Sequence, residues 1–268
     1  MSPISILRFL RTRSLFESAV VGLWISVLSG VAFGAAGDLD VTFDPGAGAN
    51  PRGVVSLLEQ ADGKILIGGN FETYGSLTRR SIARANASGS VDNSFDPGTG
   101  LDRAARSLEE QTDGKILLLG DFTTCNGFNR YCIARVNSNG SVDTAYNPGV
   151  RYSAGSILLS SALQADGKLL VGGSALFTFA GDPLPVVERY NPDGSLDTEF
   201  VMTTSTNNGL ASEILLQPDG KIIVAGTFQN AGVSQNSIRR LNSDGSLDTS
   251  FFSGATEVTG NIEDAVLQ

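Results

Sequence analysis

Short apolar runs separated by glycine-rich turns make up most of the chain. The run KIIVAG at residues 221–226 is typical, because it is too short for a helix and is bounded by Gly on either side. Polar stretches rich in Gly, Asn, Asp and Ser follow each run, and no helical period of apolar residues spans them. The pattern therefore predicts an all-β protein built from short strands and tight turns.

One phrase built around Asp-Gly-Lys occurs four times along the chain. The triplets begin at Asp62, Asp113, Asp166 and Asp219, so they are spaced by 51, 53 and 53 residues. A second phrase runs in phase with the first, and its glycines are Gly89, Gly140, Gly194 and Gly245. Self-similarity at about this period is typical of solenoids, propellers and arrays.

The first repeat reads as four strands, at residues 54–60, 64–71, 81–86 and 90–95. The second of these is almost continuously apolar, which indicates a strand buried on both faces. Four-stranded sheets stacked face to face around an axis provide that burial in a β-propeller. A β-helix has much shorter repeats, and a leucine-rich solenoid has its own Leu and Asn spacing. We therefore expect a β-propeller.

Turn chemistry fixes the expected register within each repeat. In Pro218-Asp219-Gly220 the residue types suit a type I turn closed by a glycine bulge, which joins two strands by three residues. The same turn in the second phrase places an arginine opposite an aspartate in each copy. The four expected cross-strand pairs are Arg84–Asp92, Arg135–Asp143, Arg189–Asp197 and Arg240–Asp248. Both tight turns of a repeat then lie at one end of its strands.

The expected domain boundaries follow from these repeats. Residues 1–36 carry a basic head, an apolar run and small residues, which predicts a secretory signal peptide; an uncleaved membrane anchor is the alternative. Residues 37–268 form the propeller domain. Its four complete blades are expected at 51–98, 102–149, 154–202 and 208–253. Partial strands at 37–46 and 258–268 leave an incomplete ring, so further blades are expected in a longer natural chain.

Charge and composition exclude several kinds of chemistry. The net charge is −9, and it becomes −11 without residues 1–36, which argues against nucleic-acid binding. The chain contains no His, so nucleophilic triads and imidazole metal ligands are excluded. Cys125 and Cys132 are predicted to form a disulfide in an oxidising compartment, with two free thiols as the alternative.

Candidate ligand-binding residues are few. Asn191, Asp193, Ser195 and Asp197 alternate as calcium ligands would, but turn chemistry explains them equally and the EF-hand spacing is absent. No metal, cofactor or catalytic residue is therefore expected. Recurring aromatic residues are expected to pack in the core, with a sugar-binding platform as the alternative; they are Phe71, Phe95, Phe122, Tyr146, Phe200, Phe228 and Phe251.

The loops opposite the tight turns vary most between copies. Variable loops on a rigid scaffold are where binding residues usually lie, although such loops are also simply tolerated at surfaces. The candidate binding residues in them are Tyr74, Phe128, Tyr131 and Phe179.

The paired phrases resemble the delta-60 repeat, a propeller-type repeat of exported bacterial proteins. The resemblance covers nearly all of residues 37–268, and the third copy departs most, with Ala175 where Phe71 stands in the first copy. It implies a secreted or surface repeat scaffold and carries over no catalytic residue. We expect a secreted or cell-surface, non-catalytic scaffold, not stably inserted in a membrane, that binds a protein or surface component or spaces domains. The alternatives are a lectin-like or calcium-assisted polysaccharide binder and a carboxylate-dependent hydrolase or lyase.

Overall fold

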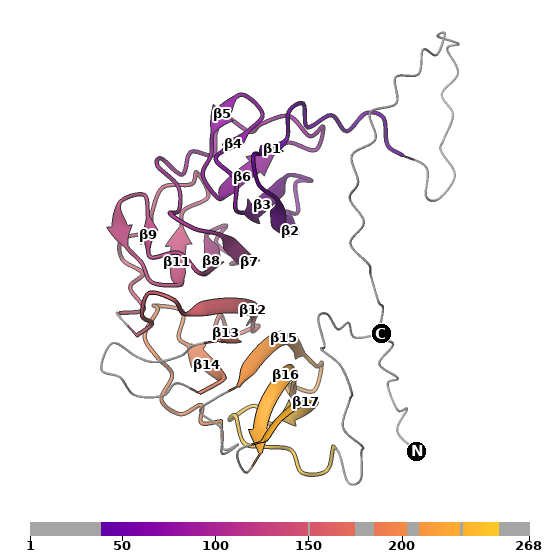
Figure 1. Cartoon of the computed structure of the whole chain (residues 1–268), viewed down its shortest axis with the longest axis vertical. Coiled ribbons are helices and arrows are strands. Elements are labelled where there is room, and N and C mark those ends of the chain that lie inside the picture. The colour runs from indigo at the N-terminus through magenta and orange to yellow at the C-terminus, as the bar shows by residue number, and fades with distance from the viewer. Residues whose placement is uncertain (1–38, 150, 175–184, 203–208, 231–232, 252–268) are drawn as a thin grey trace.

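The described residues form an arc of four small β-sheets, one for each repeat. The computed structural model describes residues 39–149, 151–174, 185–202, 209–230 and 233–251. These residues contain no helix, and hence no helix that could span a membrane. The sheets follow one another around an arc that is open on one side (Figure 1). The predicted all-β propeller architecture is confirmed, and the ring is not closed.

Each blade contains a three-stranded antiparallel sheet whose strands are in sequence order. Blade 1 consists of β2 (Val54–Glu59), β3 (Ile65–Gly69) and β6 (Ile82–Ala85). Blade 2 consists of β7 (Ala105–Glu110), β8 (Ile116–Gly120) and β11 (Ile133–Val136). Blade 3 consists of β12 (Ile157–Leu163), β13 (Leu169–Ser174) and β14 (Val187–Tyr190). Blade 4 consists of β15 (Leu210–Leu216), β16 (Ile222–Asn230) and β17 (Val233–Leu241).

The second strand of each blade lies at the centre of its sheet. In blade 2, every residue of β8 is buried, as its continuously apolar sequence predicted. Successive side chains of a strand point to opposite faces. Leu118 accordingly packs toward blade 1, whereas Leu117 packs toward blade 3. The sheet of blade 2 is thus covered by a neighbouring blade on both faces, which is the burial expected of stacked blades.

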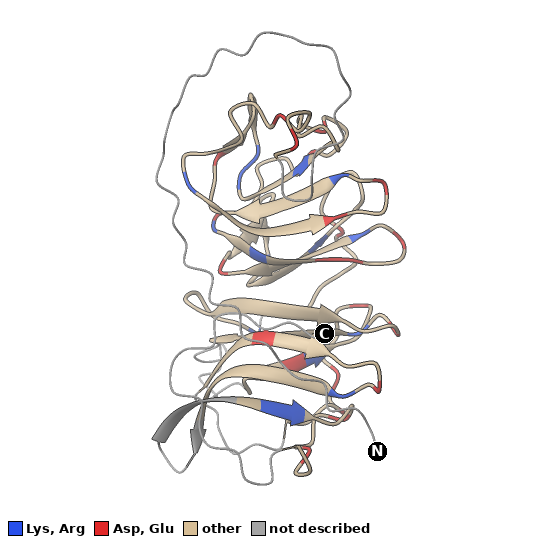
Figure 2. Ribbon diagram, turned by 90° about the vertical axis from the view of Figure 1, so that its right-hand side faces the viewer, with Lys and Arg blue, Asp and Glu red and all other residues tan. Residues whose placement is uncertain are grey.

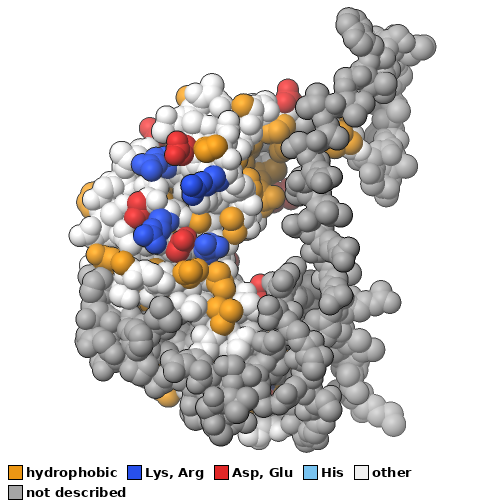
Figure 3. Space-filling view, viewed as in Figure 1, with side chains coloured by type: hydrophobic (Ala, Val, Ile, Leu, Met, Phe, Trp, Pro, Cys, Tyr) orange, Lys and Arg blue, Asp and Glu red, His pale blue; other side chains and the backbone are white. Residues whose placement is uncertain are grey.

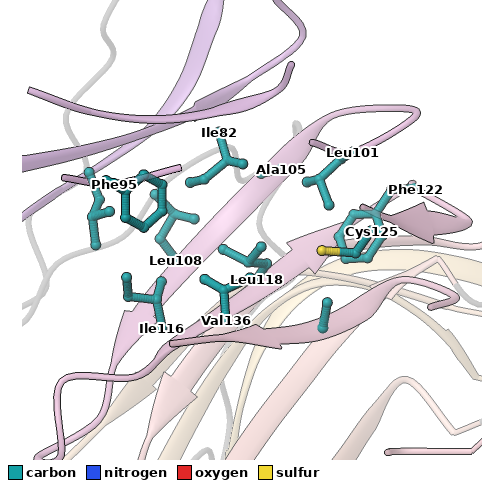
Figure 4. Packing of buried hydrophobic residues seen from close by; sticks show 12 residues of the cluster. Ile82, Phe95, Leu101, Ala105, Leu108, Ile116, Leu118, Phe122, Cys125 and Val136 are labelled. Atoms are coloured by element: carbon teal, nitrogen blue, oxygen red, sulfur yellow. The ribbon is translucent and has the colours of Figure 1, made fainter. Parts of the chain in front are cut away.

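The apolar core lies between blades rather than within one sheet. Between blades 1 and 2, Ile82 and Phe95 of the first repeat meet Leu108, Leu118 and Val136 of the second (Figure 4). Burying a side chain of this size stabilises the fold by roughly 1.5–3 kcal/mol relative to exposure. Equivalent clusters join blade 2 to blade 3 and blade 3 to blade 4.

The prediction of a fourth strand in each blade is wrong. The segment after the second tight turn forms a single β-bridge with the third strand and then leaves the sheet. In blade 1 that bridge joins Ala85 to Val91. The Asp92 carboxylate then accepts hydrogen bonds from the backbone N–H and the hydroxyl of Ser94, at 2.9 and 2.6 Å. Such a local cap offers the backbone an alternative to the β-ladder. The chain therefore leaves the sheet and carries Phe95 into the core between blades.

The N-terminal partial strand is also absent as a strand, yet its residues take the expected place. Residues 39–46 form turns and irregular chain, with no strand. The backbone N–H of Asp44 donates to the carbonyl of Ser88 at 2.8 Å, as that of Asp96 donates to Asn139. This segment therefore sits on blade 1 as the end of one repeat sits on the next blade. The signal peptide at 1–36 and the partial strand at 258–268 lie outside the described residues.

Two small hairpins follow β3 in blade 1 and β8 in blade 2, and the first of them reaches back to the second tight turn, where Tyr74 contacts Gly89. The first comprises β4 (Thr73–Tyr74) and β5 (Leu77–Thr78), and β1 (Ala49–Asn50) pairs with β4. The second comprises β9 (Thr124–Cys125) and β10 (Phe128–Asn129). Asn126 and Gly127, both with positive φ, form the turn between them. An Asn-Gly pair is a strong hairpin signal, so sequence alone could have placed this element.

The tight turns themselves have the predicted geometry. In the first phrase of blade 1, the Gln60 N–H donates to the Lys64 carbonyl at 2.8 Å and the Gly63 N–H to the Gln60 carbonyl at 2.9 Å. Gly63 has φ of 78°. We call the end of the blades that carries both tight turns the turn end, and the opposite end the loop end. Figure 2 shows acidic and basic residues together at these turns along one side of the arc.

Replacing Gly140 by Ala should destabilise the protein more than replacing Gly114 by Ala. Both glycines have positive φ, of 90° and 77°, which costs a residue with a Cβ about 1–2 kcal/mol. A Cβ on Gly140 would also lie 2.7 Å from the backbone of Asp96, whereas one on Gly114 has 3.7 Å to its nearest neighbour. Chemical denaturation of the two variants measures the difference. Equal losses would show that the second turn is not packed tightly against the preceding repeat.

Candidate functional site

The predicted arginine–aspartate pairs are present in all four repeats. The arginine Nε lies 2.8 Å from the carboxylate in Arg84–Asp92 and 2.9 Å in Arg135–Asp143. The corresponding distances are 2.7 Å for Arg189–Asp197 and 2.8 Å for Arg240–Asp248. All four aspartates are buried. The recurring acidic residues are therefore parts of the architecture.

The lysine of each Asp-Gly-Lys triplet completes this cluster. All lysines of the chain stand in these triplets. Lys64 Nζ lies 3.2 Å from Asp92, and Lys221 Nζ lies 2.6 Å from Asp248. Burial alone would raise the pKa of Asp92, but hydrogen bonds from Ser94, Arg84 and Lys64 outweigh it and hold that pKa well below its ordinary value. The two sequence phrases recur together because their side chains form one ion-paired cluster.

In each of the first three repeats the same arginine also connects its blade to the next one. Arg135 Nη1 donates to the carbonyl of Pro192 in the following repeat at 2.8 Å, and its guanidinium lies 4.4 Å from the ring centroid of Tyr146. Arg84 and Arg189 make equivalent bonds to Ser138 and Ser243, at 2.8 and 2.6 Å. One side chain thus closes a hairpin, stacks on an aromatic ring and bridges two blades.

Replacing Arg135 by Met should lower the free energy of unfolding by about 3 kcal/mol, because Asp143 would stay buried after losing one of its two cationic partners. The double variant Arg135→Met/Asp143→Leu should be the less destabilised of the two, since it buries no uncompensated charge. Arg103→Met is the control: Arg103 is exposed, so a change within about 0.5 kcal/mol is expected. Urea titration of the three variants gives the comparison. A similar loss for Arg103→Met would contradict the role assigned to Arg135.

The two carboxylates proposed as calcium ligands, those of Asp193 and Asp197, both have other partners within the protein. The Asp193 carboxylate accepts from the N–H and the hydroxyl of Ser195, at 2.8 and 2.7 Å. Asp197 pairs with Arg189 and with Lys168. The two carboxylates therefore serve different local contacts. Within the described part of the chain, no three acidic or cysteine side chains are grouped as metal ligands.

The recurring aromatic residues pack in the core as predicted. Six of them are at most 8 % exposed, and Phe251 is partly buried against the core of blade 4. Arg189 lies 4.7 Å from the ring centroid of Phe200, and Arg240 lies 4.4 Å from that of Phe251. These rings are covered by arginines and apolar side chains, so they offer no stacking face to a sugar.

The four candidate binding residues differ in how far they are exposed to solvent. Tyr74 is wrong as a surface residue, because it is 3 % exposed and its hydroxyl donates to the Gly89 carbonyl at 3.0 Å. Phe128 is 45 % exposed at the tip of the β9–β10 hairpin, beside Arg130. Tyr131 is half-buried and packs against the core between blades 2 and 3. Phe179 lies outside the described residues.

The predicted disulfide is wrong. Cys125 and Cys132 are both free and buried. Cys125 packs into the core between blades 1 and 2, whereas Cys132 packs into the core between blades 2 and 3. The two thiols thus enter different cores, and the Cys132 thiol donates to the Ser156 carbonyl at 3.4 Å. Burial raises the pKa of each thiol to about 12.

Neither thiol should react with iodoacetamide at pH 8 while the protein is folded. The thiolate is the reactive form, and a pKa near 12 leaves both groups protonated and out of solvent. Both should be alkylated in denaturant. Intact-mass measurement distinguishes zero, one and two additions. A mass lower by two hydrogens before reduction would reveal a disulfide and overturn the assignment.

A buried polar network distinguishes the third repeat. Glu188 on β14 is 4 % exposed and forms an ion pair with Arg151 at 2.5 Å. The hydroxyls of Tyr152 and Tyr190 donate to the same carboxylate at 2.6 and 3.2 Å. Burial raises the pKa of both tyrosines well above its ordinary value. Ala83 and Ala134 stand at the equivalent position of the first two repeats, so this carboxylate is not repeated there.

Arginines without an acidic partner gather at the loop end of blades 1 and 2. Figure 3 shows basic side chains interspersed with acidic ones over these two blades. Arg79 and Arg106 pair with Asp96 and Asp121, at 3.3 and 3.4 Å. Four further arginines at this end have no ion pair with any residue that the structure describes; they are Arg52, Arg80, Arg103 and Arg130.

A small cavity lies among these loops. Its volume is about 170 Å³, and it is lined by the segments that precede β2, β6 and β7 and by the segment that follows β3. Arg52 and Arg80 are among its lining residues. Sequence reasoning missed both, although the Arg79-Arg80 pair stands in a variable loop and is not repeated as such in the other copies.

Comparison with known proteins agrees with the architecture. Residues 60–95, 111–146, 164–200 and 217–251 each match the family described as "Domain of unknown function (DUF5122) beta-propeller". No curated protein matches the chain. The matches include both sequence phrases of every repeat and together cover more than half of the chain. The chain therefore belongs to the DUF5122 β-propeller family, whose function is unknown.

Proposed function

We propose that this protein is an exported, non-catalytic β-propeller scaffold that binds a protein or another cell-surface component through the loop end of its blades. The observation that carries the proposal is a division of its charged residues. At the turn end, the recurring arginine, aspartate and lysine of each repeat form ion pairs with one another that stabilise the fold. Four arginines at the loop end, Arg52, Arg80, Arg103 and Arg130, have no ion pair with a residue that the structure describes.

An exposed aromatic residue lies on the hairpin that begins at the same end. Phe128 projects from the β9–β10 hairpin and is one of the few large apolar side chains exposed in blade 2. Loops carried on a rigid sheet framework are where binding surfaces usually lie. The loop end and the β9–β10 hairpin that begins there thus combine unpaired charge, an exposed ring and sequence variation between copies.

A non-catalytic role is supported by how the acidic residues are engaged. The recurring aspartates are ion-paired in every repeat. Glu188, the buried carboxylate that is not repeated in the first two blades, is surrounded by Arg151 and two tyrosine hydroxyls. A carboxylate held in this way has no open side from which to act on a substrate.

The export half of the proposal rests on the sequence of residues 1–36. A basic head followed by an apolar run and small residues is typical of a secretory signal. The repeat phrases, which resemble those of exported bacterial proteins, favour the same location.

Removing the exposed loop-end side chains should abolish ligand capture without loss of fold. The variant Phe128→Ser/Arg103→Gln is immobilised beside the unchanged protein and exposed to surface proteins and polysaccharides of the source organism. The control Ser88→Asp/Asn139→Asp alters the turn end, where repeats 3 and 4 already carry Asp193 and Asp244 at the equivalent position. Capture of an identified component should be lost only with the loop-end variant.

Loss of capture by the turn-end control alone would contradict the proposal. A hydrolytic or lyase activity abolished by Glu188→Gln would replace the non-catalytic scaffold with an enzyme. Circular dichroism of each variant separates a loss of binding from a loss of fold.

A further inference from the structure

The cavity at the loop end of blade 1 is lined mainly by polar side chains. Phe71 and Leu101, at most 2 % exposed, form part of the lining. The polar lining residues come from several loops and include both charges, amides and hydroxyls; they are Arg52, Asn70, Glu72, Arg80, Ser81 and Asp102. About 170 Å³ is enough space for one sugar ring and too little for a large cofactor.

The guanidinium groups of Arg52 and Arg80 suit the cavity to binding a ligand that carries a carboxylate. Neither Arg52 nor Arg80 has an ion pair with a described residue, and both are exposed. A guanidinium binds a carboxylate through two parallel hydrogen bonds, which gives both affinity and orientation. In a chain of net charge −9, unpaired arginines facing one cavity mark a local exception.

The acidic residues of the lining narrow the choice of ligand. Asp102 is held in place by hydrogen bonds from Thr123 and Thr124, between 2.6 and 2.8 Å, and Glu72 has no ion pair in the described structure. Carboxylates repel a phosphate or a second ligand carboxylate, but they accept hydrogen bonds from hydroxyls. The ligand should therefore combine one carboxylate with several hydroxyl groups.

We propose that this cavity binds a uronic-acid residue of an acidic polysaccharide. The sugar carboxylate pairs with Arg52 and Arg80, its hydroxyls donate to Glu72 and Asp102, and Asn70 and Ser81 complete the polar contacts. An acidic peptide has the carboxylate but lacks vicinal hydroxyls, so it fits the lining less well.

The surface beside the cavity suits a ligand with further acidic units. Arg103 precedes β7 as Arg52 precedes β2, so the arginine recurs one blade along. Arg130 and Phe128 lie on the hairpin that follows. A polymer with a carboxylate on each unit can therefore continue from blade 1 to blade 2. This inference rests on the proposed function, because it names the ligand of the same loop end.

The test is binding of defined oligosaccharides to the folded protein by calorimetry at low salt. Oligomers of galacturonate, glucuronate and mannuronate are the acidic probes. The methyl ester of the galacturonate oligomer keeps the hydroxyls and removes the charge, and polyglutamate keeps the charge without the hydroxyls. We expect at least one uronate oligomer to bind at least tenfold more tightly than its ester and than polyglutamate. Added salt should weaken that binding.

Two matched variants locate the site. Arg52→Gln/Arg80→Gln should weaken uronate binding at least tenfold. Ser88→Asp/Asn139→Asp, which changes the net charge by the same amount at the turn end, should leave the affinity unchanged. Equal weakening by both would show a general charge effect and would overturn the assigned cavity.

Three results would overturn the inference, and each leaves the proposed function open to its own test. They are no binding of any uronate oligomer, equal binding of the methyl ester, and binding of polyglutamate in preference to the sugars. If Phe128→Ser/Arg103→Gln still loses capture of a surface component in that case, the scaffold function stands with a different ligand. If that variant keeps full capture, the proposed function fails as well.

Discussion

A buried guanidinium in each of the first three repeats holds this structure together. Each sheet has only three short strands, so little of its apolar surface is covered from within the blade. The third-strand arginine compensates by serving two blades at once: it neutralises the aspartate across its own hairpin and donates to a turn carbonyl of the next repeat. Because the aspartate is buried, the pair must stay together, and the turn that carries the aspartate is thereby fixed against the neighbouring blade.

The features that the sequence predicted are those decided by local chemistry. A Pro-Asp-Gly or Asn-Gly segment has few backbone solutions, so the turns and their glycine bulges could be assigned directly. Turn length then determines which residues face each other, and the Arg135–Asp143 pair follows by counting. The continuous apolar run of β8 likewise predicted its position at the centre of a sheet.

The features that the sequence missed depend on competition or on distant segments. The expected fourth strand ends after one bridge because Asp92 caps the Ser94 backbone, and this local hydrogen bond wins over the ladder. Cys125 and Cys132 are six residues apart, but the hairpin and the strand that carry them present their side chains to different cores. The cavity lined by Arg52 and Arg80 is formed by four segments from two repeats, so no short sequence pattern could predict it.

The network around Glu188 limits how freely the blades could be exchanged during evolution. A repeat protein made of equivalent cassettes tolerates loss, gain or reordering of its units, because every junction offers the same surface. Here the junction of blades 2 and 3 contains a carboxylate whose charge Arg151 neutralises and to which two tyrosine hydroxyls of the third repeat donate hydrogen bonds. Moving that blade elsewhere would carry the whole network with it, and placing another blade in its position would leave its neighbour facing a differently shaped surface. The third blade is therefore less readily exchanged with the other blades than they are with one another.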